Sequence, residues 1–150
     1  MLKQPTIMLF LLGLMICTSL TSVAQKPVNW TEKQLMEPAQ LNEVISSGKD
    51  LPVIISVGPG PLLPGAINVG FINNTEGLHN LHNELGKIPK DKKVVVYCGC
   101  CPYEHCPNVR PAIDALKQMQ FTDYYLLNLP HNLKRDWIDK GYPLMKKGMN

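Results

Sequence analysis

Two runs of apolar, mostly β-branched residues constrain the fold of this chain more than any other feature of its sequence. Residues 52–57 read Pro-Val-Ile-Ile-Ser-Val, and residues 94–97 read Val-Val-Val-Tyr. Neither run alternates regularly between apolar and polar residues, and continuous runs are typical of strands that are buried on both faces. Strands of that kind belong to parallel sheets covered by helices. The two runs therefore predict the interior of an α/β domain.

Segments with helical periodicity separate the predicted strands. Helices are expected at residues 38–47, 75–85, 109–119 and 129–140, and further short strands at residues 34–36, 66–69 and 122–127. This alternation requires right-handed crossovers, so the sequence predicts a mostly parallel central sheet with helices on both faces. Ligands of such sheets bind beyond the carboxyl ends of the strands.

The first 24 residues have the pattern of a secretory signal peptide. Lys3 supplies a positive start, residues 7–20 form a short apolar run, and residues 22–24 (Ser-Val-Ala) offer small side chains before a cleavage site. We expect cleavage after Ala24 and export to the periplasm or the extracellular space. The apolar run is short for a membrane span, so no stable membrane insertion is expected after cleavage.

The rest of the chain has the length of one domain and little net charge. Residues 25–32 form a polar lead-in, and residues 33–147 are expected to form the domain. The formal net charge of the chain is +3 at pH 7, and loss of Lys3 with the signal peptide reduces it by one. This balance gives no reason to expect nucleic acid or an anionic membrane as a partner.

Four of the five cysteines follow directly on the predicted strand at residues 94–97. Asn108 is expected to cap the helix that comes next, with Pro111 in its first turn. The start of a helix favours negative charge, and a thiolate is both a nucleophile and a metal ligand. This stretch is therefore predicted to be the functional site. Its cysteines are Cys98, Cys100, Cys101 and Cys106.

Several segments match, in order along the chain, the pattern of one known family. They are residues 34–41, 64–69 (Pro-Gly-Ala-Ile-Asn-Val), 94–98 (Val-Val-Val-Tyr-Cys), 112–121, and Trp137 with 141–143 (Gly-Tyr-Pro). On these residues the chain resembles the rhodanese family of sulfurtransferase domains over about residues 33–145. The resemblance implies an α/β, rhodanese-like fold.

The resemblance also implies a reaction. Cys98 would attack the outer sulfur of a thiosulfate-like donor, carry it as a persulfide and pass it to a thiol acceptor, with no cofactor. The loop is longer here than in the family, whose loop ends in an arginine. Arg110 is the basic residue nearest that position, and the resemblance implies a catalytic role for it in the first turn of the next helix. Where the family often has Asp-x-Arg after its second strand, this chain has Ser56-Val57-Gly58.

Three hypotheses for the extra cysteines remain open at this point. In the first, Cys98 carries sulfur and one of Cys100, Cys101 and Cys106 resolves it by forming a disulfide, which an external reductant reopens. In the second, the loop binds a soft metal, Cu(I) or Zn(II), through the four cysteines with His105 as an alternative ligand. In the third, disulfides fix the loop of a rhodanese-like binding module without catalytic activity.

Overall fold

A single five-stranded parallel sheet forms the centre of the computed structural model, which describes residues 28–146. The strand order is β1-β5-β4-β2-β3, so β4 lies in the middle, and every strand pair is parallel. The sheet confirms the predicted α/β fold. The expected signal peptide lies outside the described residues. The strands are β1 (Leu35–Met36), β2 (Val53–Ser56), β3 (Ile67–Asn68), β4 (Val94–Tyr97) and β5 (Tyr124–Leu127).

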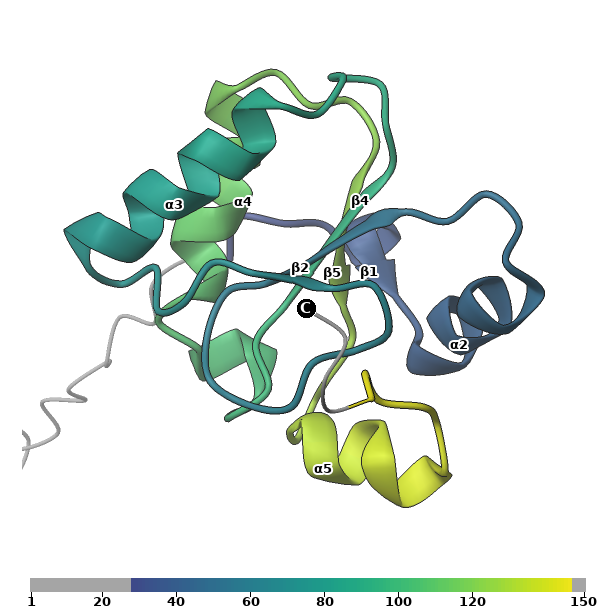
Figure 1. Cartoon of the computed structure of the whole chain (residues 1–150). Coiled ribbons are helices and arrows are strands. Elements are labelled where there is room, and N and C mark those ends of the chain that lie inside the picture. The colour runs from purple at the N-terminus through teal and green to yellow at the C-terminus, as the bar shows by residue number, and fades with distance from the viewer. Residues whose placement is uncertain (1–27, 147–150) are drawn as a thin grey trace, which may run out of the picture.

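Helices connect all consecutive strands except β2 and β3 and cover both faces of the sheet. Figure 1 shows α3 and α4 packed beside each other, away from α2 and α5. The helices are α2 (Pro38–Ser47), α3 (Thr75–Gly86), α4 (Val109–Gln118) and α5 (Leu133–Asp136), with single 3-10 turns η1 (Glu32–Gln34), η2 (Tyr103–His105) and η3 (Ile138–Lys140). The predicted helices at residues 38–47, 75–85 and 109–119 are confirmed to within one residue.

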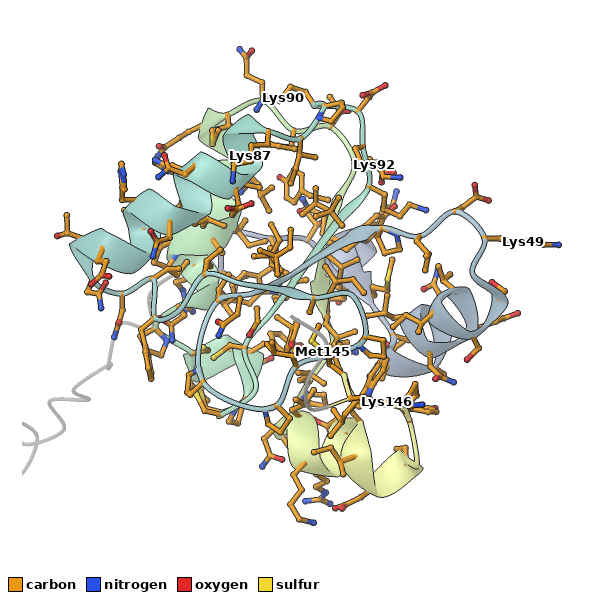
Figure 2. All side chains as sticks on the ribbon, viewed as in Figure 1. Lys49, Lys87, Lys90, Lys92, Met145 and Lys146 are labelled. Atoms are coloured by element: carbon orange, nitrogen blue, oxygen red, sulfur yellow. The ribbon has the colours of Figure 1, made fainter. Side chains whose placement is uncertain are left out.

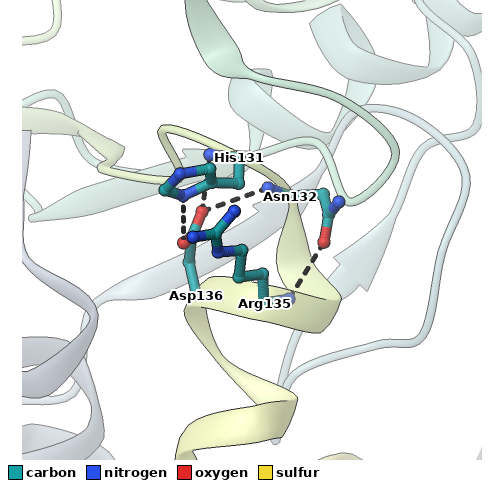
Figure 3. A network of polar contacts seen from close by, with 4 residues as sticks. All are labelled: His131, Asn132, Arg135 and Asp136. Atoms are coloured by element: carbon teal, nitrogen blue, oxygen red, sulfur yellow. Dashed lines mark hydrogen bonds and ion pairs between the residues drawn. The ribbon is translucent and has the colours of Figure 1, made fainter.

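The last predicted helix, residues 129–140, begins too early, and the structure divides it into the short helix α5 and the separate 3-10 turn η3. Residues 129–132 are not helical, and α5 begins at Leu133 after Asn132, whose side chain accepts the Arg135 N–H at 2.9 Å. Asp136 in turn accepts the backbone N–H groups of His131 and Asn132 (Figure 3). These side-chain contacts satisfy backbone donors at the start of α5, so the helix begins there. Gly141 closes the following 3-10 turn in the left-handed conformation, as its position predicted.

Alternate residues of β4 belong to two separate cores. Val94 and Val96 pack with residues of α3 and α4, whereas Val95 and Tyr97 pack with residues of α2 and α5. Side chains of a strand alternate between the two faces of a sheet. Cys98, which follows the strand, therefore lies on the face that carries α3 and α4.

Lysines lie at the end of α3 and in the segment that leads to β4. In Figure 2, Lys87, Lys90 and Lys92 lie at the end of the molecule where β4 begins, opposite its carboxyl end. Cys98 follows β4, so the expected functional site lies at the opposite end of the sheet from these lysines. Within residues 28–146, none of the helices is long and apolar enough to cross a membrane.

Candidate functional site: a cluster of four thiols

Cys98 lies immediately beyond the carboxyl end of β4, and only 4% of its surface is exposed. The segment that follows β2 forms one wall of its surroundings. The Val57 N–H donates to the Tyr97 carbonyl at 2.9 Å, which holds this segment against β4. A Cβ atom at Gly58 would lie 2.4 Å from the Cys98 Sγ. Only glycine at position 58 leaves room for the thiol in this arrangement.

The structure brings the other three cysteines of the loop to Cys98. All four Sγ atoms lie within 4.8 Å of one another. The Cys98 Sγ is 3.5 Å from that of Cys100, and the Cys100 Sγ is 3.2 Å from that of Cys101. All four are free thiols. Cys98 and Cys106 are buried, Cys101 is half-buried and Cys100 is exposed.

Hydrogen bonds fold the loop back so that Cys106 returns to Cys98. The η2 turn is closed by the Cys106 N–H, which donates to the Tyr103 carbonyl at 3.2 Å. The Tyr103 N–H donates to the Leu129 carbonyl beyond β5 at 3.3 Å, and the Tyr103 ring packs edge-on against Trp30. The loop is thus anchored to neighbouring parts of the domain. His105 lies in this turn, is exposed, and is not among the four clustered residues.

The pKa values of Cys98 and Cys106 are shifted in opposite directions. Interaction with the Cys106 thiol lowers the pKa of Cys98; burial opposes this, and the backbone N–H of Cys100 adds to it. The same pairing with Cys98, together with burial, raises the pKa of Cys106. A hydrogen bond to the charged form of a group stabilises that form. The pair therefore favours a thiolate at Cys98 and a neutral thiol at Cys106.

Cys100 and Cys101 favour the neutral form. Burial and interaction with the neighbouring thiol of Cys101 raise the pKa of Cys100. For Cys101, burial is the largest cause of a raised pKa. Of the four cysteines, Cys98 is thus the one whose surroundings favour the nucleophilic thiolate.

Asn108 has a different role from the expected one. It precedes α4, but its side chain makes no capping hydrogen bond. Its Oδ1 atom accepts the Asn73 N–H at 3.1 Å, and its Nδ2 atom donates toward the Cys98 Sγ at 3.8 Å. Asn108 is 2% exposed. The side chain therefore links the thiol to the segment before α3 and does not cap α4.

Arg110 lies in the first turn of α4, as expected. Its guanidinium donates to the Glu104 carbonyl at 3.0 Å and lies over the Trp30 ring, 5.4 Å from the ring centroid. These contacts support the cysteine loop from outside the thiol cluster. The catalytic role assigned to Arg110 by resemblance stays a prediction.

Two neighbours of Cys98, Gly58 and Asn108, were not predicted from the sequence. The sequence signals for Gly58 were its position directly after a buried strand, where ligands of parallel sheets bind, and its place where the family often has the arginine of Asp-x-Arg. Asn108 was expected to cap a helix. The contacts of Gly58 and Asn108 with Cys98 form only in the folded chain, so periodicity along the sequence cannot show them.

Comparison with known proteins supports the fold. A crystal structure of a protein from Lactobacillus plantarum matches with a TM-score of 0.58 and 18% sequence identity, covering 76% of this chain and 89% of that one. That protein has a rhodanese-like fold. No protein-family model and no curated protein matches the chain. The chain is an α/β protein with a rhodanese-like fold and a cluster of thiols at the carboxyl edge of its sheet.

Proposed function

From the rhodanese-like fold and the thiol at the end of its central strand, we propose that this protein carries sulfane sulfur as a persulfide on Cys98. The observation that carries the proposal is the surroundings of Cys98, which lower the pKa of this thiol alone among the four. A thiolate is the nucleophile in sulfur transfer, so the cysteine with the lowered pKa is the carrier.

The first step is a displacement at sulfur. The Cys98 thiolate attacks the outer sulfur of a thiosulfate-like donor, the sulfur–sulfur bond of the donor breaks, and sulfite leaves with the bonding electron pair. Cys98 then holds one extra sulfur as a persulfide. In the second step, the thiolate of an acceptor attacks that outer sulfur, becomes a persulfide itself and releases the Cys98 thiolate.

Cys100 offers a second outcome for the persulfide. Its Sγ lies 3.5 Å from that of Cys98 and is exposed. A Cys100 thiolate that attacks the Cys98 sulfur would form a Cys98–Cys100 disulfide and release sulfide, and an external thiol reductant would then reopen the bond. The pKa of Cys100 is also raised, but Cys106 is the less suitable resolving residue, because its thiol is buried and its pKa is raised the most of the four.

The proposed setting of this reaction is the periplasm or the extracellular space.

Intact-mass measurement of the reduced protein before and after thiosulfate tests the proposal. We expect the protein to gain the mass of one sulfur atom, and Cys98→Ser to gain none. Cys101→Ser is the matched control, because it removes a thiol of the same cluster and leaves the carrier in place. Cys100→Ser should keep the persulfide and release less sulfide.

Two results would contradict the proposal. One is a reduced protein that, after thiosulfate, has neither gained a sulfur atom nor formed a disulfide. The other is an equal gain in Cys98→Ser, which would place the sulfur on a different cysteine.

A further inference from the structure

We propose that the four clustered cysteines also bind one thiophilic d10 cation, Zn(II) or Cu(I). The binding site consists of the sulfur atoms of Cys98, Cys100, Cys101 and Cys106. The proposal does not depend on sulfur transfer, because it rests on the arrangement of the four sulfurs and not on the reactivity of one of them.

The distances between the sulfurs are close to those of a four-thiolate metal site. Zinc–sulfur bonds of about 2.3 Å in a tetrahedron place the sulfurs about 3.8 Å apart. Here two of the separations are 3.5 and 3.2 Å, and none exceeds 4.8 Å. To reach this separation, the two closest pairs would have to open by about 0.3 and 0.6 Å, and no pair would have to close by more than about 1.0 Å.

The sulfurs also form a compact group and not a row, because no two of the four lie more than 4.8 Å apart. Cys98 interacts with Cys106 and Cys100, Cys100 with Cys101, and Cys101 with Cys106, which closes a ring, and Cys98 also interacts with Cys101 across it. Two members of the ring are buried, and Cys100 and Cys101 are accessible to an entering ion. The packed interior holds the buried sulfurs of Cys98 and Cys106 in place, whereas those of Cys100 and Cys101 can adjust to the ion.

Donors around the inner sulfurs would support a bound metal. The backbone N–H of Cys100 interacts with Cys98, and the backbone N–H of Asn108 interacts with Cys106. The Nδ2 atom of Asn108 also points toward the Cys98 Sγ. Hydrogen bonds of this kind orient metal ligands and reduce the negative charge that several thiolates place at one site.

The ligand set selects the class of metal. Four thiols without a carboxylate among them suit soft cations and not Mg²⁺ or Ca²⁺, which require oxygen ligands. Each thiol that binds releases its proton, so the affinity falls as the pH is lowered. His105 is not required, because the four sulfurs already provide the ligands of a closed tetrahedral site.

Metal binding and sulfur transfer would exclude each other. Both use the Cys98 sulfur, and binding to a metal engages the lone pair with which that sulfur would attack a donor. If the protein carries sulfur as proposed above, the bound metal would therefore switch that activity off.

Titration of the full chain, reduced and freed of metal, tests the proposal. We expect one Zn(II) or one Cu(I) per chain, measured in separate experiments against a chelator selective for each ion. Co(II) is the spectroscopic probe: it should give thiolate-to-cobalt charge-transfer absorption and the strong visible bands of tetrahedral coordination, and Zn(II) should remove both.

Matched variants separate this site from sulfur transfer. Cys101→Ser should lower the metal affinity at least about tenfold, judged from the effect of losing even an outer-shell partner, and keep the persulfide on Cys98. Cys100→Ser repeats the test at an exposed position, where the fold is least affected, and circular dichroism checks that both variants fold. His105→Ala should bind metal as tightly as the unaltered protein.

Absence of stoichiometric binding by the reduced, folded protein would overturn the proposal. Unchanged affinity in both Cys100→Ser and Cys101→Ser would do the same. An equal loss of affinity in His105→Ala would show a different ligand set from the one proposed.

Discussion

At the scale of single residues, the chemistry of the site depends on the pairing of Cys98 with Cys106. Cys106 is fully buried and its thiol favours the thiolate of its partner, while its own pKa is raised by the same interaction. Loss of one thiol therefore changes the reactivity of the other. Cys106 is a positioning residue that acts through Cys98.

Replacement of Cys106 by alanine should make Cys98 less reactive at neutral pH. The substitution removes the thiol that most lowers the pKa of Cys98, so this pKa should rise. Only the thiolate reacts, and the rate of Cys98 alkylation by iodoacetamide rises with pH through its pKa. We expect the rate profile to move to higher pH and the rate at neutral pH to fall severalfold.

Cys106→Ser is the conservative variant for this measurement. Its hydroxyl keeps a donor at the same place, so its profile should lie between the other two. Identical profiles for the unaltered protein and Cys106→Ala would contradict the assigned role. Peptide mass mapping confirms that the label measured is on Cys98.

At the scale of elements, the start of α5 depends on the side chain of Asp136. The carboxylate accepts the backbone N–H groups of His131 at 2.7 Å and Asn132 at 3.1 Å, and lies 2.9 Å from the His131 ring nitrogen (Figure 3). Burial opposes ionisation of Asp136, but these hydrogen bonds outweigh it and lower its pKa. The segment matters to the site, because the Leu133 N–H donates to the Gly99 carbonyl beside Cys98 at 3.2 Å.

Asp136→Ala should reduce the free energy of unfolding by about 1–3 kcal/mol, the usual effect of leaving such donors without their charged acceptor. Urea unfolding at neutral pH measures the change. Because the pKa of Asp136 is lower in the folded state, its contribution is present above about pH 4, near the ordinary aspartate value, and is lost as the pH falls further through the folded-state pKa.

Asp139→Ala is the control for this experiment. Asp139 pairs with Lys134 at 2.7 Å, and both side chains are exposed, so its loss should cost less than about 1 kcal/mol. A stability difference between the unaltered protein and Asp136→Ala that persists unchanged at pH 2 would contradict the proposed mechanism.

At the scale of the whole molecule, the site exists because β2 and β4 are neighbours in the sheet. Their parallel pairing places Ser56 beside Tyr97, and the segments that follow these residues leave the sheet together. Gly58 then faces the Cys98 thiol, and a side chain at Gly99 would meet the Pro59 carbonyl at 2.9 Å. The two segments are therefore packed backbone to backbone.

Gly58→Ala should displace the Cys98 thiol. The added Cβ would lie 2.4 Å from its sulfur, so either the thiol or the segment after β2 must move. We expect slower alkylation of Cys98, less persulfide after thiosulfate, and a loss of about 1–3 kcal/mol in stability from overpacking.

Gly86→Ala provides the comparison, because a Cβ at that position has no atoms within 4 Å. It should leave both Cys98 measurements unchanged. Reactivity and stability equal to those of the unaltered protein in Gly58→Ala would show that the contact does not constrain the thiol.

Features that depend on neighbours along the chain could be predicted from the sequence. The continuous runs at residues 53–56 and 94–97 become the two central strands. Gly48 ends α2 in a left-handed conformation, as a glycine after a helical segment predicts. The position of Cys98 at the carboxyl end of a strand follows from the same local pattern.

The tertiary structure decided which groups meet. The mutual approach of the four sulfurs depends on the Tyr103 anchor beyond β5, and Asn108 turns to Asn73 and Cys98 because the fold places them within its reach. The late start of α5 likewise follows from contacts of Asp136 that no periodicity shows. A strand forms through its own apolar residues, whereas a polar side chain bonds to whichever partner the completed fold brings to it.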